Sequence, residues 1–324
     1  MQEEDISLHY RPIDIEFLNQ AGKEHFDIYY KTEAFGSVNF VKFASSRPEH
    51  QEKVHKLLES GECEEIFYIH EEDLFKYYQQ ATQSLRTIVT SSAVPLQVKT
   101  KKVYQVSKGI MKEFFEYNTS RKILNSSEEV MEIMDDCMAK TEVGFSAIAQ
   151  ITNKDYYTYT HSVNVGLYCM TFAVKCKMKK EDIKQFGLGG MLHDVGKSKI
   201  SAELINKNGK LTEQEFLEMQ KHSPLGEEML VDMKTYSPCV INMAGQHHEK
   251  FKGGGYPKGL VGNEIAIHAR VCKIMDVYDA LTTRRSYKKA MAPFDALTLM
   301  KKQMGDDFDN LLLDRFIALM GPDM

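Results

Sequence analysis

The 324-residue sequence has no tryptophan and only eight prolines, and none of the prolines lies between Pro95 and Pro224. Because proline interrupts helices, this gap allows long helices in the middle of the chain. The six cysteines form no Cys-x-x-Cys pair, and the N-terminus is the acidic, polar MQEEDIS rather than a signal peptide. Scattered thiols without a secretion signal predict a reduced, cytoplasmic protein, and they argue against a cysteine-ligated zinc site.

Long apolar runs and a strong charge of one sign are also missing. No run of about 18 apolar residues is present, so we expect no membrane span. The net charge is −5, which gives no reason to expect binding to a nucleic acid polymer or an anionic membrane. With 43% hydrophobic and 27% charged residues, the chain has the balance of an ordinary globular protein. Its length is typical of about two domains.

The N-terminal part has a mixed pattern. Short β-branched and aromatic runs at 26–30, 38–43 and 66–70 predict strands, and the helical spacing of apolar residues within 47–62 predicts a helix between the second and third. The histidines of this part share no spacing, so we find no catalytic cluster in it. We expect residues 1–100 to form a small α/β domain that regulates the remainder or docks a signalling partner.

Helical spacing dominates after this unit. We expect a helix over 72–95, connecting helices within 101–150, and an almost entirely helical domain over 151–324. The connecting helices have two interpretations: they carry a signal between domains, or they pack as the first helices of the C-terminal domain, which we favour. The predicted fold class is therefore α+β, a small N-terminal α/β domain followed by an all-α domain.

The stretch GGMLHDVGKSK, which ends at Lys199, contains the strongest local signal. His193 and Asp194 stand side by side at the end of an apolar helical run, and Lys197 follows three residues later. Neighbours in a helix point about 100° apart, so a helix that ends at this pair can direct both side chains into one cavity. An imidazole, a carboxylate and a lysine in one cavity suit a metal and a phosphate.

Other histidines and an aspartate occur in similar apolar helical surroundings: His161, His222, His247, His248 and Asp276. A single histidine of this kind is more often a core residue, but a carboxylate is costly to bury unless it is paired or bound to a cation. Five such histidines and two aspartates are unexpected as a coincidence. Imidazole and carboxylate ligands together suit iron, manganese or zinc.

The order H…HD…H…HH…D, with HDVGK at 193–197 and HHEKFKGGGYPKG at 247–259, resembles the HD-GYP family of the HD phosphohydrolase superfamily. The similarity extends from about residue 155 to 316 and includes THSVNV, HSPLGEEML, EIAIHARV and DVYDALTTRRSYKKA. The resemblance implies an all-helical, metal-dependent domain that hydrolyses cyclic di-GMP.

The resemblance also implies a role for each matching residue. One metal would be held by His161, His193, Asp194 and Asp276. Asp194 would bridge to a second metal, whose other ligands would be His222, His247 and His248. The cofactors would be two divalent ions, Fe or Mn. Two metals close together can bind a water, lower its pKa and neutralise phosphate oxygens, which suits attack on a phosphodiester.

The remaining implied residues surround the substrate. Lys197 matches the lysine that contacts the scissile phosphate, and Arg285 and Lys288 match basic residues near the other phosphate or a base. Asp155 matches an acidic residue beside the site, which we place with Asp194 and Lys197 among the catalytic residues. Gly255, Tyr256 and Pro257 form the signature loop near the substrate.

Three positions depart from the family pattern. Tyr157 stands where some members have a glutamate that helps to hold a third metal, so we predict two metals. Lys252 stands where an acidic residue usually precedes the loop, a change that alters the local charge and weakens a turn. Arg285 is followed by serine instead of proline, which is a milder change.

We expect a cytoplasmic phosphodiesterase that converts cyclic di-GMP to pGpG, and possible further cleavage would give GMP. Two alternatives stay open: a receptor that binds a cyclic dinucleotide with little turnover and signals through the N-terminal domain, and a phosphodiesterase for another cyclic dinucleotide such as cyclic GMP-AMP. Tyr157 and Lys252 motivate the receptor. The sequence leaves the native metal open and is compatible with a homo-oligomer.

Overall fold

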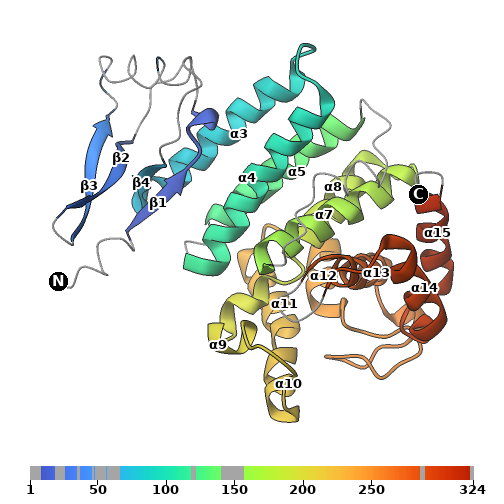
Figure 1. The fold of residues 1–324 in the computed structure, drawn as a ribbon. Helices are drawn as coiled ribbons and strands as arrows, with labels where there is room; N and C mark the ends of the chain where they lie inside the picture. Colours follow the sequence, from blue (N-terminus) through green and yellow to red (C-terminus); the bar gives the residue numbers. More distant parts are fainter. Residues whose placement is uncertain are drawn as a thin grey trace. The chain divides into compact units, whose positions relative to one another are not determined.

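The computed structural model describes residues 9–18, 26–34, 37–45, 47, 56, 66–117, 122–139, 157–284 and 289–321. The chain divides into two compact units, Met1–Val94 and Pro95–Met324. The first contains the strands and one long helix, and the second is helical (Figure 1). This is the α+β class expected from the sequence.

The first unit contains a four-stranded antiparallel sheet in the order β1-β4-β2-β3. Its strands are β1 (Tyr10–Ile13), β2 (Ile28–Ala34), β3 (Ser37–Ala44) and β4 (Phe67–His70). The last three confirm the predicted strands within one or two residues at most ends, whereas β2 extends four residues further. The sequence did not predict β1, a four-residue strand that contains a proline. The helix predicted within 47–62 lies outside the described residues, apart from the isolated positions 47 and 56.

Alternate side chains along strand β4 point into the core of this unit. Phe67 and Ile69 of β4 are buried while their neighbours are half-buried. The helix α3 (Leu74–Thr90) buries a stripe with helical spacing that includes Leu74, Tyr78 and Leu85. Two short 3-10 helices, η1 (Ile15–Phe17) and η2 (Glu71–Asp73), lead into these elements.

The described residues of the second unit form helices and short 3-10 turns. In chain order they are α4 (Leu96–Tyr117), α5 (Lys122–Ala139), α7 (Thr158–Lys175), α8 (Lys180–Leu192), η3 (Val195–Lys199), α9 (Ala202–Ile205), α10 (Glu213–Gln220), α11 (His222–Met233), α12 (Pro238–Gln246), η4 (Gly262–Glu264), α13 (Ile267–Thr282), α14 (Pro293–Gln303), η5 (Gly305–Asp307) and α15 (Asn310–Met320). Among the described helices, none is both long enough and apolar enough to cross a bilayer.

Helix α7 is the centre of this unit. Every side chain from Thr160 to Ala173 is buried, because α4, α8, α13 and α15 pack around it. The helices α4 and α5, expected as connecting helices, pack against α7 and α8 within the same unit. A helix surrounded in this way needs small or apolar residues on all faces, and the stretch SVNVGLYCMTFA supplies them.

Several of the surrounding helices have ends that come close to one another. Helix α8 ends immediately before His193, α12 ends immediately before His247, and α11 begins with His222. Helix ends allow the chain to turn and direct consecutive polar side chains into one space. Two further polar residues, His161 and Asp276, lie within α7 and α13.

Candidate metal centre

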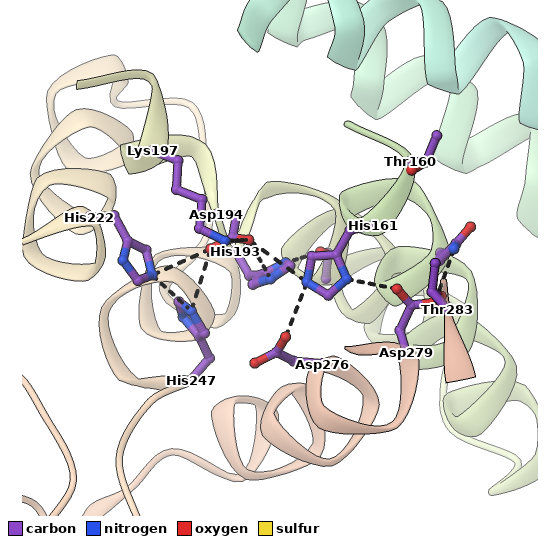
Figure 2. A network of polar contacts seen from close by, with 12 residues as sticks. Thr160, His161, His193, Asp194, Lys197, His222, His247, Asp276, Asp279 and Thr283 are labelled. Carbon is purple, nitrogen blue, oxygen red and sulfur yellow. Dashed lines mark hydrogen bonds and ion pairs between the residues drawn. The ribbon is translucent and has the colours of Figure 1, made fainter. Parts of the chain in front are cut away.

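The seven polar residues predicted from the sequence come together in two adjoining groups. One contains Asp194, His222, His247 and His248, and the other contains His161, His193 and Asp276. Within each group the candidate ligand atoms lie within 4.8 Å of one another. Figure 2 shows His222 and His247 on one side of Asp194, and His161 and Asp276 on the other.

Asp194 lies between the two groups, and each of its oxygens faces one of them. Oδ1 is 3.3 Å from His222 Nε2 and 3.8 Å from His247 Nε2. Oδ2 is 3.2 Å from His193 Nε2 and 3.8 Å from His161 Nε2. A carboxylate with this geometry can contribute one oxygen to each of two cations.

Three of the histidines are oriented by backbone carbonyls. His193 Nδ1 donates to the Gly190 carbonyl at 2.7 Å, and His222 Nδ1 donates to the Met219 carbonyl at 2.7 Å. His247 Nδ1 contacts the carbonyls of the preceding turn at 3.0 Å. Since a carbonyl can only accept, Nδ1 carries the proton in each ring. The Nε2 lone pairs therefore point towards the centre, as in metal-binding histidines.

His161 is oriented by a side chain instead. Its Nδ1 donates to Asp279 Oδ2 at 2.7 Å, so its Nε2 lone pair faces Asp276 Oδ1 at 3.1 Å. Asp279 is itself held, because its Oδ1 accepts from Asn164 Nδ2 at 2.9 Å and from the Thr283 hydroxyl at 3.2 Å (Figure 2). The sequence placed Asp279 one turn after Asp276 but assigned it no role.

Burial determines the charge of these side chains. It lowers the pKa of His222 to about 4 and holds the pKa values of His247 and His248 well below the ordinary value, so all three imidazoles are neutral near pH 7. Burial by itself would raise the pKa of Asp194, but the adjacent His193 and then Lys197 hold it well below its ordinary value. Neutral imidazoles beside an ionised carboxylate are the protonation states that a divalent cation requires.

Two buried atoms of the centre lack a hydrogen-bond partner among the described residues: His193 Nε2 and Asp194 Oδ1. In addition, the Nε2 atoms of His222 and His247 face each other at 3.3 Å, although both are acceptors. Unsatisfied buried acceptors are costly unless a cation binds them. The donor set therefore fits a divalent metal, and this histidine–aspartate centre can bind one.

The close packing of η3 on α11 depends on Gly196. A Cβ at this position would lie 1.9 Å from the His222 carbonyl oxygen and 2.6 Å from the Gly226 nitrogen. Only glycine permits this approach, which brings the turn after Asp194 against the first turn of α11. The glycine of HDVGK thus has a packing role that the motif alone did not reveal.

The signature loop covers His248. The Tyr256 ring stacks on the His248 ring with centroids 4.6 Å apart. The buried Glu249 carboxylate holds the following segment, because it accepts from the backbone N–H groups of Lys258, Gly259 and Leu260 at 2.7, 3.1 and 3.0 Å. Glu249 is a positioning residue that the sequence analysis did not identify.

Lys252, one of the departures from the family pattern, has a partner. Its Nζ lies 2.5 Å from Asp306 Oδ1, and its backbone N–H donates to the Asp306 carbonyl at 3.1 Å. The neighbouring Lys250 pairs with Asp307 at 3.0 Å. These bonds tie the segment before the loop to η5, and the expectation that Lys252 weakens a turn stays a prediction.

A cavity of about 1440 Å³ borders the histidine–aspartate centre. Its lining includes Asp194, Lys197, His222, His248, Tyr256 and Asp276. Lys197 also pairs with Asp194 Oδ2 at 2.5 Å. Asp155, Arg285 and Lys288, which we expected near the substrate, lie outside the described residues, as does the Ser286 departure.

Aromatic residues also line this cavity where α7 begins. Tyr157, which stands at the position of the third-metal glutamate, is 54% exposed and stacks on Tyr159 with centroids 5.3 Å apart. Burial, and then the nearby Glu116 carboxylate, raise the pKa of Tyr159 to about 12. Phe115 and Glu116, at the end of α4, contribute to the same lining.

Comparison with known families gives one model match, to the HD domain, over residues 144–312. This interval contains all seven residues of the two groups, and it begins after α4 and α5. The match confirms the resemblance inferred from the order of histidines and aspartates.

Among curated proteins, the chain is 35% identical over 175 residues to the cyclic di-GMP phosphodiesterase PA4108 of Pseudomonas aeruginosa, which covers 54% of this chain and 42% of that protein. It is 29% identical over 267 residues to the 3'3'-cGAMP-specific phosphodiesterase 3 of Vibrio cholerae, and the similarity covers 76% of this chain and 56% of that protein. The chain thus spans about half the length of these relatives.

Among solved structures, the fold is similar to that of Bd1817, an HDG"Y"P protein from Bdellovibrio bacteriovorus. The TM-score is 0.67, the identity is 17%, and the similarity covers 96% of this chain and 99% of that one. At this identity the likeness concerns the fold, and it extends over both units.

Proposed function

The chain belongs to the HD-domain family, and from this premise we propose that it is a metal-dependent phosphodiesterase that hydrolyses cyclic di-GMP to pGpG. Further cleavage would give GMP. The observation that carries the proposal is the position of Asp194, whose two oxygens face the two ligand groups. Such an arrangement would suit two divalent cations that act together on a phosphodiester.

The proposed cofactors are two divalent ions, iron or manganese. His161, His193, Asp194 and Asp276 would hold one, and Asp194, His222, His247 and His248 would hold the other. When bound, these ions would neutralise charge on the phosphate and lower the pKa of a water. Tyr157 has no carboxylate to offer a third ion, which supports the count of two.

The chain's own residues then position the substrate. Lys197 borders the cavity with its ammonium group on Asp194, where a phosphate oxygen could take over as its partner, and the ammonium would stabilise the negative charge of the transition state. Tyr256 offers a ring beside His248 for contact with the nucleotide. We assign supporting roles to Asp155, Arg285 and Lys288 from the family resemblance alone.

The proposal locates the protein in the cytoplasm, where its free cysteines would stay reduced. The first unit would regulate the second or dock a signalling protein. Its described residues contain no group of metal-binding side chains, so we assign it no part in the hydrolysis.

A turnover assay with metal analysis tests the proposal. The protein, purified without oxygen and loaded with iron or manganese, should bind two ions per chain and release pGpG from cyclic di-GMP. His193→Ala and Asp194→Ala should abolish turnover and reduce the bound metal. Absence of turnover with both sites occupied would overturn the phosphodiesterase proposal and favour a receptor.

Cyclic GMP-AMP belongs in the same assay. The relative that covers 76% of this chain is named for specificity towards 3'3'-cGAMP. A preference of the wild-type protein for this dinucleotide would change the proposed substrate and leave the proposed reaction class intact.

A further inference from the structure

The wall of the cavity where α7 begins is not used by the proposed hydrolysis. It is formed by Phe115 and Glu116 from the end of α4 and by Tyr157 and Tyr159 from the start of α7. Phe115 and Glu116 precede residue 144, where the family match begins. This chain therefore brings two residues to the cavity from outside the family-defining region.

The two tyrosines stack on each other and form an aromatic surface. Their rings are nearly parallel, with an interplanar angle of 8° and centroids 5.3 Å apart. Tyr157 is more than half exposed although it borders a cavity, so its ring has a free face for a further planar group. Nucleic acid bases stack on such faces in many proteins.

Glu116 lines the same cavity as the two tyrosines, and its carboxylate contributes to the raised pKa of Tyr159. The carboxylate pairs with Lys112 at 3.7 Å, and this is an exposed pair one helical turn apart. Exposed pairs of this kind are weak, so the carboxylate can exchange that partner for a ligand.

We propose that Glu116, beside the Tyr157–Tyr159 surface, reads a guanine base of the dinucleotide and gives the cavity its preference for guanine over adenine. A carboxylate has two acceptor oxygens, and the Watson–Crick edge of guanine presents two adjacent donors, N1–H and N2–H. Adenine presents the unprotonated N1 acceptor at the corresponding place, which a carboxylate repels. This inference rests on the proposed function, since it assumes a cyclic dinucleotide in the cavity.

Glu116→Gln in the full-length, metal-loaded protein tests the proposal. The amide keeps one acceptor and replaces the other with a donor that opposes a guanine donor. We expect KM for cyclic di-GMP to rise about tenfold, the size of one bidentate contact, with kcat unchanged. Turnover of cyclic di-AMP, if the wild type has any, should not fall.

Glu218→Gln is the matched control. Glu218 is also an exposed glutamate paired with a lysine, Lys221, but it is not among the cavity-lining residues. Its substitution should leave KM for both dinucleotides unchanged. An equal KM for cyclic di-GMP in wild type and Glu116→Gln would overturn the guanine-reading role while the proposed function stands.

Calorimetry with GMP and AMP separates this inference from the proposed function. Wild type should bind GMP more tightly than AMP, and Glu116→Gln should lose most of this difference. If wild type hydrolyses no cyclic dinucleotide but the GMP preference disappears in the variant, the phosphodiesterase proposal fails and the guanine site stands. Equal binding of GMP and AMP by wild type would overturn the guanine site.

Discussion

The two groups of the centre differ in the way that one of their histidines, His161, is held. In the group of His222 and His247, each Nδ1 donates to a backbone carbonyl of the preceding turn. In the other group, His193 also donates to a backbone carbonyl, but His161 donates to the Asp279 carboxylate, which is fixed in turn by Asn164 and Thr283. A carbonyl is present whatever the sequence, whereas the carboxylate and its partners are side chains.

This difference determines what mutation can change. A carboxylate makes the imidazole more basic and fixes its tautomer, so it strengthens a metal bond beyond what a carbonyl does. The group of His161 can therefore be tuned by substitution away from the metal. His222 and His247 can be reoriented only by moving the backbone. Substitutions around each group should separate the two groups experimentally.

Asp279→Asn should give the largest effect. The amide oxygen still accepts from His161 Nδ1, but the negative charge that supports the imidazole is lost. We expect the binding of one of the two proposed ions to weaken by about 10- to 100-fold, while the other ion keeps its affinity. Metal titration followed by elemental analysis measures both affinities.

Asp232→Asn is the control for this variant, since Asp232 is an exposed aspartate on α11. It should bind both ions as wild type does. Equal weakening of both ions in Asp279→Asn would contradict the separation, and it would mean that the two groups respond as one unit.

Glu249→Gln tests how the third histidine of the other group is held. The ring of His248 stacks on the ring of Tyr256. The segment that follows Tyr256 is held by hydrogen bonds from its backbone N–H groups to the Glu249 carboxylate. Glutamine has an NH2 group in place of one carboxylate oxygen and carries no charge. The loss of the charge-assisted bonds should lower the free energy of unfolding by about 1.5–3 kcal/mol. Thermal unfolding of the metal-free protein measures this cost. Glu228→Gln, on the exposed face of α11, should have little effect, and an unchanged melting temperature in Glu249→Gln would refute the anchoring role.

Tyr104→Phe probes the outer end of the His161 network. The buried Tyr104 hydroxyl of α4 bonds to Asn164 Oδ1 at 3.0 Å, and Asn164 donates to Asp279. Loss of this bond should cost about 1 kcal/mol and weaken metal binding less than Asp279→Asn does. Tyr236→Phe offers a matched control, because the buried Tyr236 hydroxyl has no hydrogen-bond partner among the described residues. Equal destabilisation by both variants would show that the Asn164 bond contributes nothing.

The gathering of seven side chains could be predicted from the sequence, because buried histidines and carboxylates in apolar helices require a common partner. Their roles as ligands stay a prediction. Asp279 could not be assigned, since its hydrogen bond to His161 joins residues 118 positions apart and depends on how α13 packs against α7. The cavity wall was missed for a similar reason: the family pattern begins after α4.

The fold shows the same division between local and distant information. Helical spacing predicted α3, α4 and α5, and the β-branched and aromatic runs predicted β2, β3 and β4. Strand β1 was missed because Pro12 has no backbone N–H to donate and because four residues give little periodicity. The strand is stabilised by pairing with β4, which lies more than fifty residues later in the chain. Pairing of this kind is decided by tertiary structure and leaves no local signal.

The smallest effect is expected outside both groups, at Glu215 of α10. Its carboxylate pairs with Lys207 and accepts from the Thr212 N–H in a capping box, and the Lys207 bond, followed by the Thr212 bonds, lowers its pKa to about 2. Because the folded-state pKa lies below the unfolded value, its stabilising contribution is complete well above pH 4.5 and declines as the pH falls towards 2. Glu215→Gln should therefore melt slightly below wild type at pH 6, and the difference should shrink between pH 4.5 and 3. Metal affinity should not change, because Glu215 belongs to neither of the two histidine–aspartate groups. A melting difference that stays constant with pH would assign the effect to the shape of the side chain instead of its charge.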